Sequence, residues 1–459
     1  MTQQGVRWTA DQVLALAPDT ASRKAGSKLG TAGPWSQTGS SDEGAVWGLC
    51  KGSGSKPYQT IVDTGGDSGG GSGPAYKCSC PSRKFPCKHA LGLLLLWSGG
   101  AGQVPDGQAP PEWTEQWLAG RRQRAAAKRT AQDAPDAGSA PADPDAARRR
   151  AERRAQRITA GATELEQRLT DLLRGGLAQA ERAGYGLWEE TAARMVDAQA
   201  PGLAARVREL GAIPGSGAGW PVRLLEECAL LHLLDQGWLH RAGLPEDLAA
   251  TVRSRVGLPT QATQAAQRDD WLVLAQYDSA DGHLTTRRIW LYGTAAHRTA
   301  LLLSYGAAGR APALALPAGL ALDASVAGYP GAGTPRVELG EQFGAARPTD
   351  VRPAGVDVGA ALAAYGEALT ADPWLESWPV TLTDVVPARD PDGGGWQLAD
   401  AEGKSALPLV PQASAASGLW RLVAVSGGAP VTVFGECGHR GFRPLATWTG
   451  AAGDVISLC

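Results

Sequence analysis

Four side chains of metal-binding type lie within twelve positions of this chain: Cys78, Cys80, Cys87 and His89. They form two pairs, Cys-x-Cys and Cys-x-His, separated by six residues. In an extended segment residues i and i+2 point to the same side, so each pair can grip one ion from one side. Three sulfurs and one imidazole are typical of a tetrahedral structural zinc site. The spacing therefore predicts a zinc site of the Cys3His type.

The alternative is a disulfide, or thiols that lie close together by accident. The Cys-x-Cys spacing is too tight for ordinary disulfide geometry, and Pro81 and Pro86 stiffen the loop between the two pairs. Because protein side chains fill all four ligand positions, none is open for a substrate water. The spacing thus indicates a structural metal rather than a catalytic one.

The segment CSCPSRKFPCKHALGLLLLW resembles the SWIM zinc fingers, whose pattern is Cys-x-Cys, a variable gap and Cys-x-His. The resemblance is complete at the four ligand positions. The letters WG at 47–48, GSG at 52–54 and PY at 57–58 also resemble the strand region before the finger in bacterial SWIM zinc finger family proteins. The later phrase MVDAQAPGLAARVREL is similar to the same bacterial family.

This resemblance implies a small sheet before the ligands and a helix after the histidine. It implies binding to DNA or protein rather than catalysis. Bacterial proteins of this architecture resemble accessory proteins of AAA-type ATPase systems, so the resemblance implies a partner in such a system.

The composition favours a soluble cytoplasmic protein without a membrane partner. The net charge is −2 over 459 residues, so no overall field attracts the chain to nucleic acid or membrane. The N-terminus lacks a basic segment followed by a long apolar run, and the most apolar window, residues 90–97, is too short to span a bilayer. The seven cysteines are odd in number and partly clustered at metal spacing, which fits a reducing compartment.

Composition and periodicity predict an α+β multidomain chain. We expect a zinc module of small sheet and helix at residues 1–118, a basic Pro/Ala linker at 119–157, a helical domain at 158–262, and a mainly antiparallel β domain at 265–459. The linker centre, TAQDAPDAGSAPADPDA, has the composition of a disordered segment. The flanking clusters RRQRAAAKR and ARRRAERRAQR are interpreted as solvated helix ends, with phosphate binding as the alternative.

Local patterns place the first elements. Thr9 and Gln12 have the spacing of a capping box before a short helix. A second short helix is expected at residues 20–29, strands at 45–50 and 58–63, and an apolar helix at 90–97. Trp113 and Trp117 share one helical face and are expected to pack on the zinc module rather than to stack on bases.

The middle of the chain predicts a helical bundle, because its apolar residues recur at helical spacing. The predicted buried stripes contain Leu165, Leu169, Leu172, Leu173, Trp188, Ala192, Met195, Leu203, Val207, Leu210, Leu224, Cys228, Leu231 and Trp238. His232 and His240 are interpreted as core or surface histidines rather than metal ligands, since no third ligand lies nearby.

From Trp271 onward the pattern changes to that of strands. A hairpin is expected around the turn at 281–282, followed by strands at 336–339, 380–387, 396–399, 419–425, 430–434 and 444–448 and a helix at 358–369. The prediction is a barrel-like or sandwich-like, mainly antiparallel region.

No catalytic grouping is visible in the sequence, and we expect the protein not to be an enzyme. Lys404 and Ser405 end a phosphate-loop pattern, but Leu398 stands where its first glycine belongs. Cys437, His439 and Cys459 are interpreted as a chance grouping rather than a second zinc site.

Four basic residues, Lys77, Arg83, Lys84 and Lys88, surround the predicted site. They either offset the net −1 charge of three thiolates around a dication or bind phosphates, and both interpretations stay open. The overall hypothesis is a non-enzymatic, zinc-binding interaction protein with a protein partner. The alternative is a DNA- or nucleic-acid-binding protein that uses the finger and the flanking arginine clusters.

Overall fold

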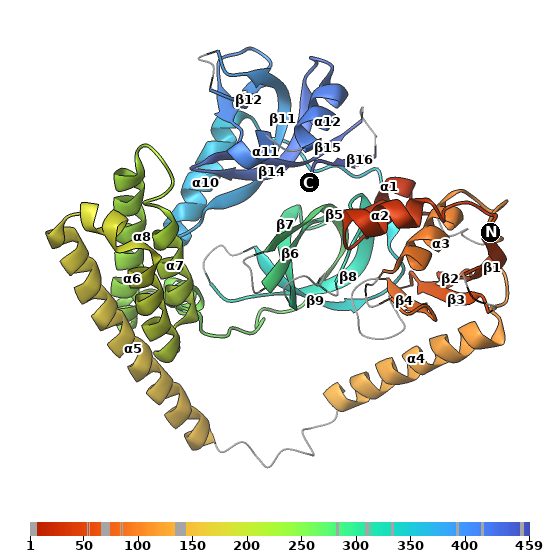
Figure 1. The fold of residues 1–459 in the computed structure, drawn as a ribbon, viewed down its shortest axis with the longest axis horizontal. Coiled ribbons are helices and arrows are strands. Elements are labelled where there is room, and N and C mark those ends of the chain that lie inside the picture. Colours follow the sequence, from red (N-terminus) through yellow and green to blue (C-terminus); the bar gives the residue numbers. More distant parts are fainter. Residues whose placement is uncertain are drawn as a thin grey trace.

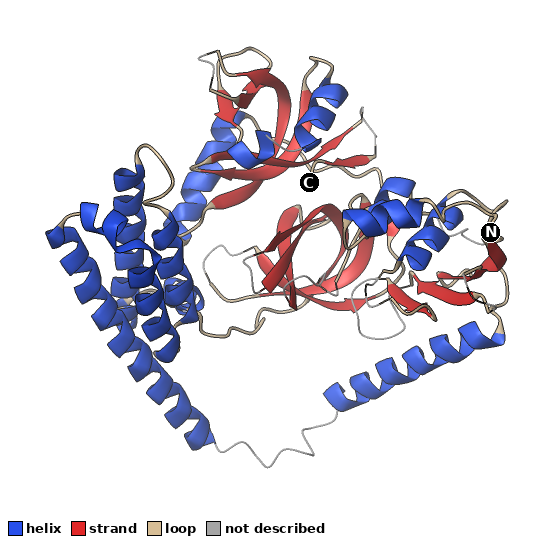
Figure 2. Ribbon diagram, viewed as in Figure 1, coloured by secondary structure: helices blue, strands red, loops and turns tan. Residues whose placement is uncertain are grey.

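The computed structural model describes residues 7–459 except 53, 55, 66–73, 83, 85, 134–143, 281–283, 308–311, 313, 332–334, 392–393, 415–416 and 450–453. A small four-stranded sheet with helices, a helical bundle, a β-barrel and a second six-stranded sheet follow one another along the chain (Figure 1). Figure 2 shows a bundle made of helices and a barrel made of strands, whereas the small sheet and the C-terminal sheet each lie beside helices. The predicted α+β class is confirmed. The four domain boundaries stay predictions, because a fold shows elements and not independent folding units.

The N-terminal module is an antiparallel sheet covered by helices on both faces. Its strands, in sheet order, are β1 (Trp35–Ser40), β2 (Ala45–Cys50), β3 (Tyr58–Asp63) and β4 (Ala75–Cys78). Strand alternation sends Val46 toward α3 (Lys88–Ser98) and Ala45 and Trp47 toward α4 (Glu112–Asp133). Trp113 and Trp117 of α4 pack against this second face, as predicted.

Two short helices cover α3. The predicted capping box of Thr9 and Gln12 is confirmed at the start of α1 (Ala10–Leu14). Helix α2 (Thr20–Ser27) approaches α3 closely, because a Cβ at Gly92 of α3 would lie 2.5 Å from the Cβ of Leu29, just after α2. The glycine within the apolar run ALGLLLLW is therefore required by packing.

The predicted linker, residues 119–157, is helical over its described residues. Helix α4 continues to Asp133, and α5 (Pro144–Gly175) begins before the second arginine cluster. Residues 134–143 lie outside the described residues. Alanine and arginine are strong helix formers, which explains why both clusters lie in helices. Arg148 and Arg150 are exposed, in line with solvated helix ends.

The predicted bundle consists of α5, α6 (Ala178–Asp197), α7 (Pro201–Ala212), α8 (Trp220–Leu239), a 3-10 turn (Arg241–Gly243) and α9 (Glu246–Val256). Of the predicted stripe residues, those from Trp188 to Trp238 are buried in one core with Leu165 and Leu169. The prediction was wrong for Leu173, which is 45% exposed because no element covers that side of α5 among the described residues. Trp374, from beyond the barrel, completes this core, and its Nε1 donates to the Leu230 carbonyl at 2.8 Å.

The β-barrel contains β5 (Gln267–Ala280), β6 (Leu284–Gly293), β7 (Arg298–Ala307), β8 (Leu320–Gly328), β9 (Arg336–Gln342) and the short β10 (Arg347–Pro348). The order is β10-β8-β5-β6-β7-β9, and a further β8–β9 pairing closes the sheet. The predicted β5–β6 hairpin is confirmed, although its turn at 281–282 lies outside the described residues. The sequence analysis missed β7, whose Ala300, Leu301 and Leu302 are all buried, because a strand covered on both faces loses the alternation of apolar and polar residues.

The C-terminal sheet has the order β13-β12-β11-β14-β15-β16. Its strands are β11 (Ser377–Arg389), β12 (Trp396–Asp400), β13 (Ala406–Pro408), β14 (Val431–Gly438), β15 (Gly441–Trp448) and β16 (Val455–Ser457), and its helices are α10 (Val358–Ala371), α11 (Pro411–Ser414) and α12 (Ser417–Ser426). The predicted strand at 419–425 was wrong: this segment lies in α12. Leu419, Leu422 and Ser426 are buried at helical spacing, a pattern that the valine-rich run obscured.

None of the helices among the described residues combines the length and apolar character needed to span a bilayer.

One carboxyl group is sealed inside the bundle. Asp235 of α8 is fully buried, and neither carboxyl oxygen has a hydrogen-bond partner in the described structure. Burial, and next the charge of Glu166, raise the pKa of Asp235 to about 9. Because an unfolded aspartate ionises near pH 3.9, the folded chain holds an extra proton between these values. Asp235 therefore lowers the free energy of unfolding progressively as the pH rises from about 4 to about 9.

Asp235→Asn is expected to remove this pH dependence. The free energy of unfolding of the variant, relative to the original chain, should rise by up to about 1.4 kcal/mol for each pH unit in that range. Urea unfolding of both proteins at a series of pH values measures this difference in the free energy of unfolding. Asp171→Asn, at an exposed residue of α5, is the control. An equal difference at all pH values would contradict the assignment.

Candidate metal centre

The end of the small sheet and the start of α3 meet at the four predicted ligands. Cys78 is the last residue of β4, and Cys80 follows in the turn. Cys87 is the N-cap of α3, and His89 lies in its first turn. A sheet end and a helix start can converge in this way because each ligand pair sits at the boundary of a regular element. The positive end of the helix dipole also points toward the cluster, which favours thiolates there.

The ligand atoms of Cys78, Cys80, Cys87 and His89 all lie within 4.8 Å of one another. His89 Nδ1 is 3.7 Å from the Sγ of Cys78. Zinc bound tetrahedrally at its usual bond lengths separates its sulfur and nitrogen ligand atoms by about 3.6–3.8 Å. The donor set and its spacing therefore fit a tetrahedral ion of this size, and the cluster can hold a metal.

The surroundings suit a structural centre. Cys87 and His89 are 1% and 5% exposed, whereas Cys78 and Cys80 are half-buried. All four ligand positions belong to the protein, so the centre offers no open position to substrate. The arrangement can stabilise a fold, and nothing in it activates a water.

Two groups next to the cluster were missed by the sequence analysis. The hydroxyl oxygen of Thr60 is 3.3 Å from the Sγ of Cys78, its direct neighbour in the β3–β4 pairing. The ring of Tyr58 lies 4.8 Å from that of His89, between centroids. Such neighbours orient metal ligands. Only the tertiary structure reveals them, because Thr60 is 18 positions from Cys78 and Tyr58 is 31 positions from His89 in sequence.

Without a cation, three thiols this close do not ionise together. A hydrogen bond from the Cys87 thiol lowers the pKa of Cys78 to about 4, and the same bond raises the pKa of Cys87. Burial raises the pKa of Cys80. A metal ion that binds all three sulfurs as thiolates must therefore displace protons from Cys80 and Cys87.

The described basic residues around the centre differ in their contacts. Lys77 and Lys88 are exposed. The ammonium of exposed Lys84 lies 2.6 Å from the carboxylate of Asp19, and this hydrogen bond is the main cause that lowers the pKa of Asp19 to about 2. Arg83 lies outside the described residues. At least one of the four predicted cations thus already has an anionic partner within the chain.

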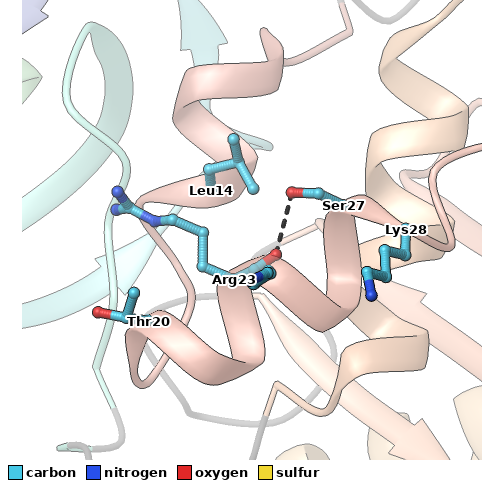
Figure 3. A pocket seen from close by; sticks show the side chains of 6 residues that line it. Leu14, Thr20, Arg23, Ser27 and Lys28 are labelled. Carbon is cyan, nitrogen blue, oxygen red and sulfur yellow. Dashed lines mark hydrogen bonds between the residues drawn. The ribbon is translucent and has the colours of Figure 1, made fainter.

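A shallow hollow of about 480 Å³ adjoins the same module (Figure 3). It is lined by Leu14, Thr20, Arg23, Lys24, Ser27 and Lys28. Asp19, the partner of Lys84, is the N-cap of the helix that forms this hollow. Three cationic side chains therefore gather on α2 and just after it, beside the finger.

The remaining candidate residues have other partners. His232 Nδ1 lies 2.7 Å from Glu166, and His439 Nδ1 lies 3.2 Å from the hydroxyl of Tyr365. Cys437 is buried in β14. Within the described part of the chain, the finger is the single group of three or more such residues placed to hold a metal.

Comparison with known protein families identifies two segments. Residues 63–97 match the SWIM zinc finger, and residues 153–256 match the SWIM-associated four-helix bundle domain. Neither a curated protein nor a solved structure gave a significant match to the chain. The chain therefore contains a SWIM zinc finger and the helical bundle associated with it, and the resemblance drawn from the Cys and His spacing is confirmed.

Metal retention is expected to fall as the pH falls, because protons compete for the same sulfurs. In a metal-bound fold the ligand thiols have pKa values below the unfolded value of about 8.5. Metal binding therefore stabilises the fold at high pH, and this stabilisation is lost on acidification. Metal-to-protein ratios after dialysis at about pH 8 and about pH 4.5 measure the loss. A ratio that does not change with pH would contradict thiolate ligation.

Proposed function

We propose that this chain is a non-enzymatic interaction protein in which structural zinc holds the finger and the helical bundle binds a protein partner. The observation that carries the partner assignment is an uncovered apolar face on α8. The zinc assignment is supported separately by the donor chemistry of the finger.

Zinc is favoured as the metal by ligand type and number. Three thiolates and one imidazole at tetrahedral spacing match its preference, whereas magnesium and calcium prefer oxygen ligands. The ion neutralises sulfurs that otherwise hold protons, and it ties β4 to the first turn of α3. The finger's helix carries Leu91, Leu93, Leu94 and Leu96, all fully buried, so its position decides the core of the module.

Cys80→Ser is expected to abolish stoichiometric zinc and to destabilise the N-terminal module, because a serine hydroxyl is a poor substitute for a thiolate ligand. Zinc content by atomic absorption and thermal unfolding measure both effects. Cys459→Ser, at the opposite end of the chain, is the matched control and should keep its zinc. Full zinc content in the Cys80 variant would exclude the ligand assignment.

Helix α8 is apolar on two sides. Leu224, Cys228, Leu231, Leu234 and Trp238 face the bundle core. On the opposite side Val222, Leu225 and Leu233 are 61%, 48% and 45% exposed, with exposed Ala229 between them. An apolar stripe on a helix of a globular protein normally faces a core or a partner. The open side of α8 is therefore the part of this bundle that most resembles an uncovered interface.

Helix α5 extends this apolar face. Trp238 Nε1 donates to Thr159 and Gln236 Nε2 to Glu166, so α5 and α8 run antiparallel. Because the two helices are antiparallel, Leu173 of α5, seven residues after Glu166, lies at the level of Leu225 of α8. Leu173 is 45% exposed. We call Leu173, Val222, Leu225, Ala229 and Leu233 the α5–α8 face. Its residues on α8 recur at i, i+3, i+7 and i+11, the spacing with which a helix presents apolar anchors to a partner protein.

Charge substitution on the α5–α8 face is expected to release the partner. The double variant Leu225→Glu with Leu233→Glu should lose partners that the original chain captures from cell lysate, since burying two carboxylates in an apolar interface is costly. Leu362→Glu, at a residue 47% exposed on α10, is the control and should retain them. Equal capture by the double variant would contradict a role for this face.

Nucleic acid is the second candidate ligand. It is supported by the exposed Lys77 and Lys88, by the cationic hollow on α2, and by the arginines of α5. Nuclease treatment in the same capture experiment separates the candidates: partners lost with the nucleic acid favour the second one. An AAA-type ATPase system as the source of the partner is an expectation that comes from family resemblance.

The proposal includes a cytoplasmic location. It is supported by the need of the finger for reduced thiols, which persist in a reducing compartment.

A further inference from the structure

The barrel has a specific connectivity. Its first strand, β5, pairs with β6 and β8; β7 pairs in parallel with β9, and β9 closes on β8. Numbered along the chain from β5 to β9, the cyclic order is 1-2-3-5-4, which is that of the five-stranded Greek-key barrel known as the OB-fold. The long β5 serves two neighbours, and its register with β6 shifts between Val273 and Ala275, as a strand does when it bends around a barrel.

Barrels of this connectivity bind ligands on the outer surface of strands 2 and 3, here β6 and β7. Alternation sends Ile289, Leu291, Ala300 and Leu302 into the barrel and leaves the intervening residues outside. One end of this outer surface is closed by the chain itself. Leu272, Trp290 and Leu301 pack there against Phe434, Leu445 and Trp448 of the C-terminal sheet.

The other end of the surface stays open. The same alternation places Thr286 and Arg288 of β6 and Leu303 and Tyr305 of β7 on it, with Thr286 opposite Tyr305 and Arg288 opposite Leu303. Arg288, Thr286 and Leu303 are half-buried, and Tyr305 is 48% exposed. The exposed ring of Tyr305 therefore lies at the edge of a surface that has the guanidinium of Arg288 at its centre.

The charge at this end is positive. Arg288 is the β-pairing neighbour of Tyr277, and the guanidinium of Arg443 from β15 lies 4.1 Å from the ring centroid of Tyr277. Two carboxylates on the described strands at this end are already engaged. Buried Glu436 accepts hydrogen bonds from Tyr277 at 2.7 Å and from Trp290 at 2.9 Å, and Asp278 is held by Arg287 at 2.7 and 2.8 Å.

We propose that this open end of the β6–β7 surface binds a short stretch of single-stranded nucleic acid. Arg288 and Arg443 contact the phosphates, and the ring of Tyr305 stacks on an unpaired base. In a duplex the bases stack on one another, so no base is available to stack on Tyr305. An oligosaccharide needs acceptors for its hydroxyls, whereas Glu436 and Asp278, on the described strands here, are already bonded within the protein. The site uses none of the finger ligands and no residue of the α5–α8 face, so it stands or falls independently of the proposed function.

Fluorescence anisotropy with the full chain and a labelled oligothymidylate at low salt tests the proposal. Tyr305→Ala and Arg288→Glu are each expected to weaken binding by about tenfold or more, and added salt should weaken it further. Tyr329→Ala is the matched control: this tyrosine also lies on the barrel beneath an arginine, Arg336, at 4.2 Å, but outside the β6–β7 surface. It should bind like the original chain.

Three results would overturn the proposal: no oligonucleotide binding at low salt, unchanged affinity in Tyr305→Ala, or equal loss in Tyr329→Ala. Because Arg288 is half-buried, its variant is judged only if zinc content and thermal unfolding match the original chain. The exposed Tyr305 carries the decision if that variant misfolds. Oligosaccharide binding that Tyr305→Ala abolishes, without oligonucleotide binding, would also exclude nucleic acid as the ligand.

Discussion

The N-terminal module depends on how the charge of three sulfurs held close together is balanced. Cys78, Cys80 and Cys87 converge where β4 ends and α3 begins, and a cation allows all three to be thiolates there. The position of α3 then fixes the module, because the helix contacts the sheet on one side and α1 and α2 on the other. The effect reaches further: Ala315, before β8, and Leu320, the first residue of β8, lie in the same core as Val13, Leu16 and α3. The finger is therefore built into the side of the barrel rather than tethered to it.

Similar joints connect the other parts. Trp374 enters the core of the bundle from the C-terminal region, and Arg255 of α9 holds the carboxylate of Asp372 two residues earlier. The C-terminal sheet in turn covers half of the β6–β7 surface through Phe434 and Trp448. Each joint combines a large aromatic side chain with a small number of polar contacts, which is how interfaces between domains gain both area and orientation. The α5–α8 face and the open end of the barrel, the two surfaces proposed to bind partners, keep exposed side chains outside these joints.

Sequence patterns predicted most of the local structure, and the errors have physical causes. Capping residues, helical stripes and the β5–β6 hairpin were correct because each depends on neighbours within a few positions. The segment at 419–425 was assigned to a strand because its apolar and β-branched residues suit both states, and only the buried spacing of Leu419 and Leu422 distinguishes them. Strand β7 was missed because packing on both faces removed its alternation. The linker at 119–157 stays a prediction: the alanine and arginine on both sides of its proline-rich centre lie in α4 and α5, and the centre itself lies outside the described residues.

The sequence alone determined the four candidate ligands, because three cysteines and one histidine at this spacing are typical of a structural zinc site. It also determined the helical bundle, whose core residues recur at one period. Only the tertiary structure decided that Thr60 and Tyr58 adjoin the ligands. It also decided that Leu173 is exposed although it belongs to an apolar stripe. Finally, it decided that five strands close into a barrel whose β6–β7 surface is partly covered by the C-terminal sheet. These features depend on contacts between residues far apart in the chain, where the partner of each residue is fixed by strand register and helix packing and not by its neighbours in sequence.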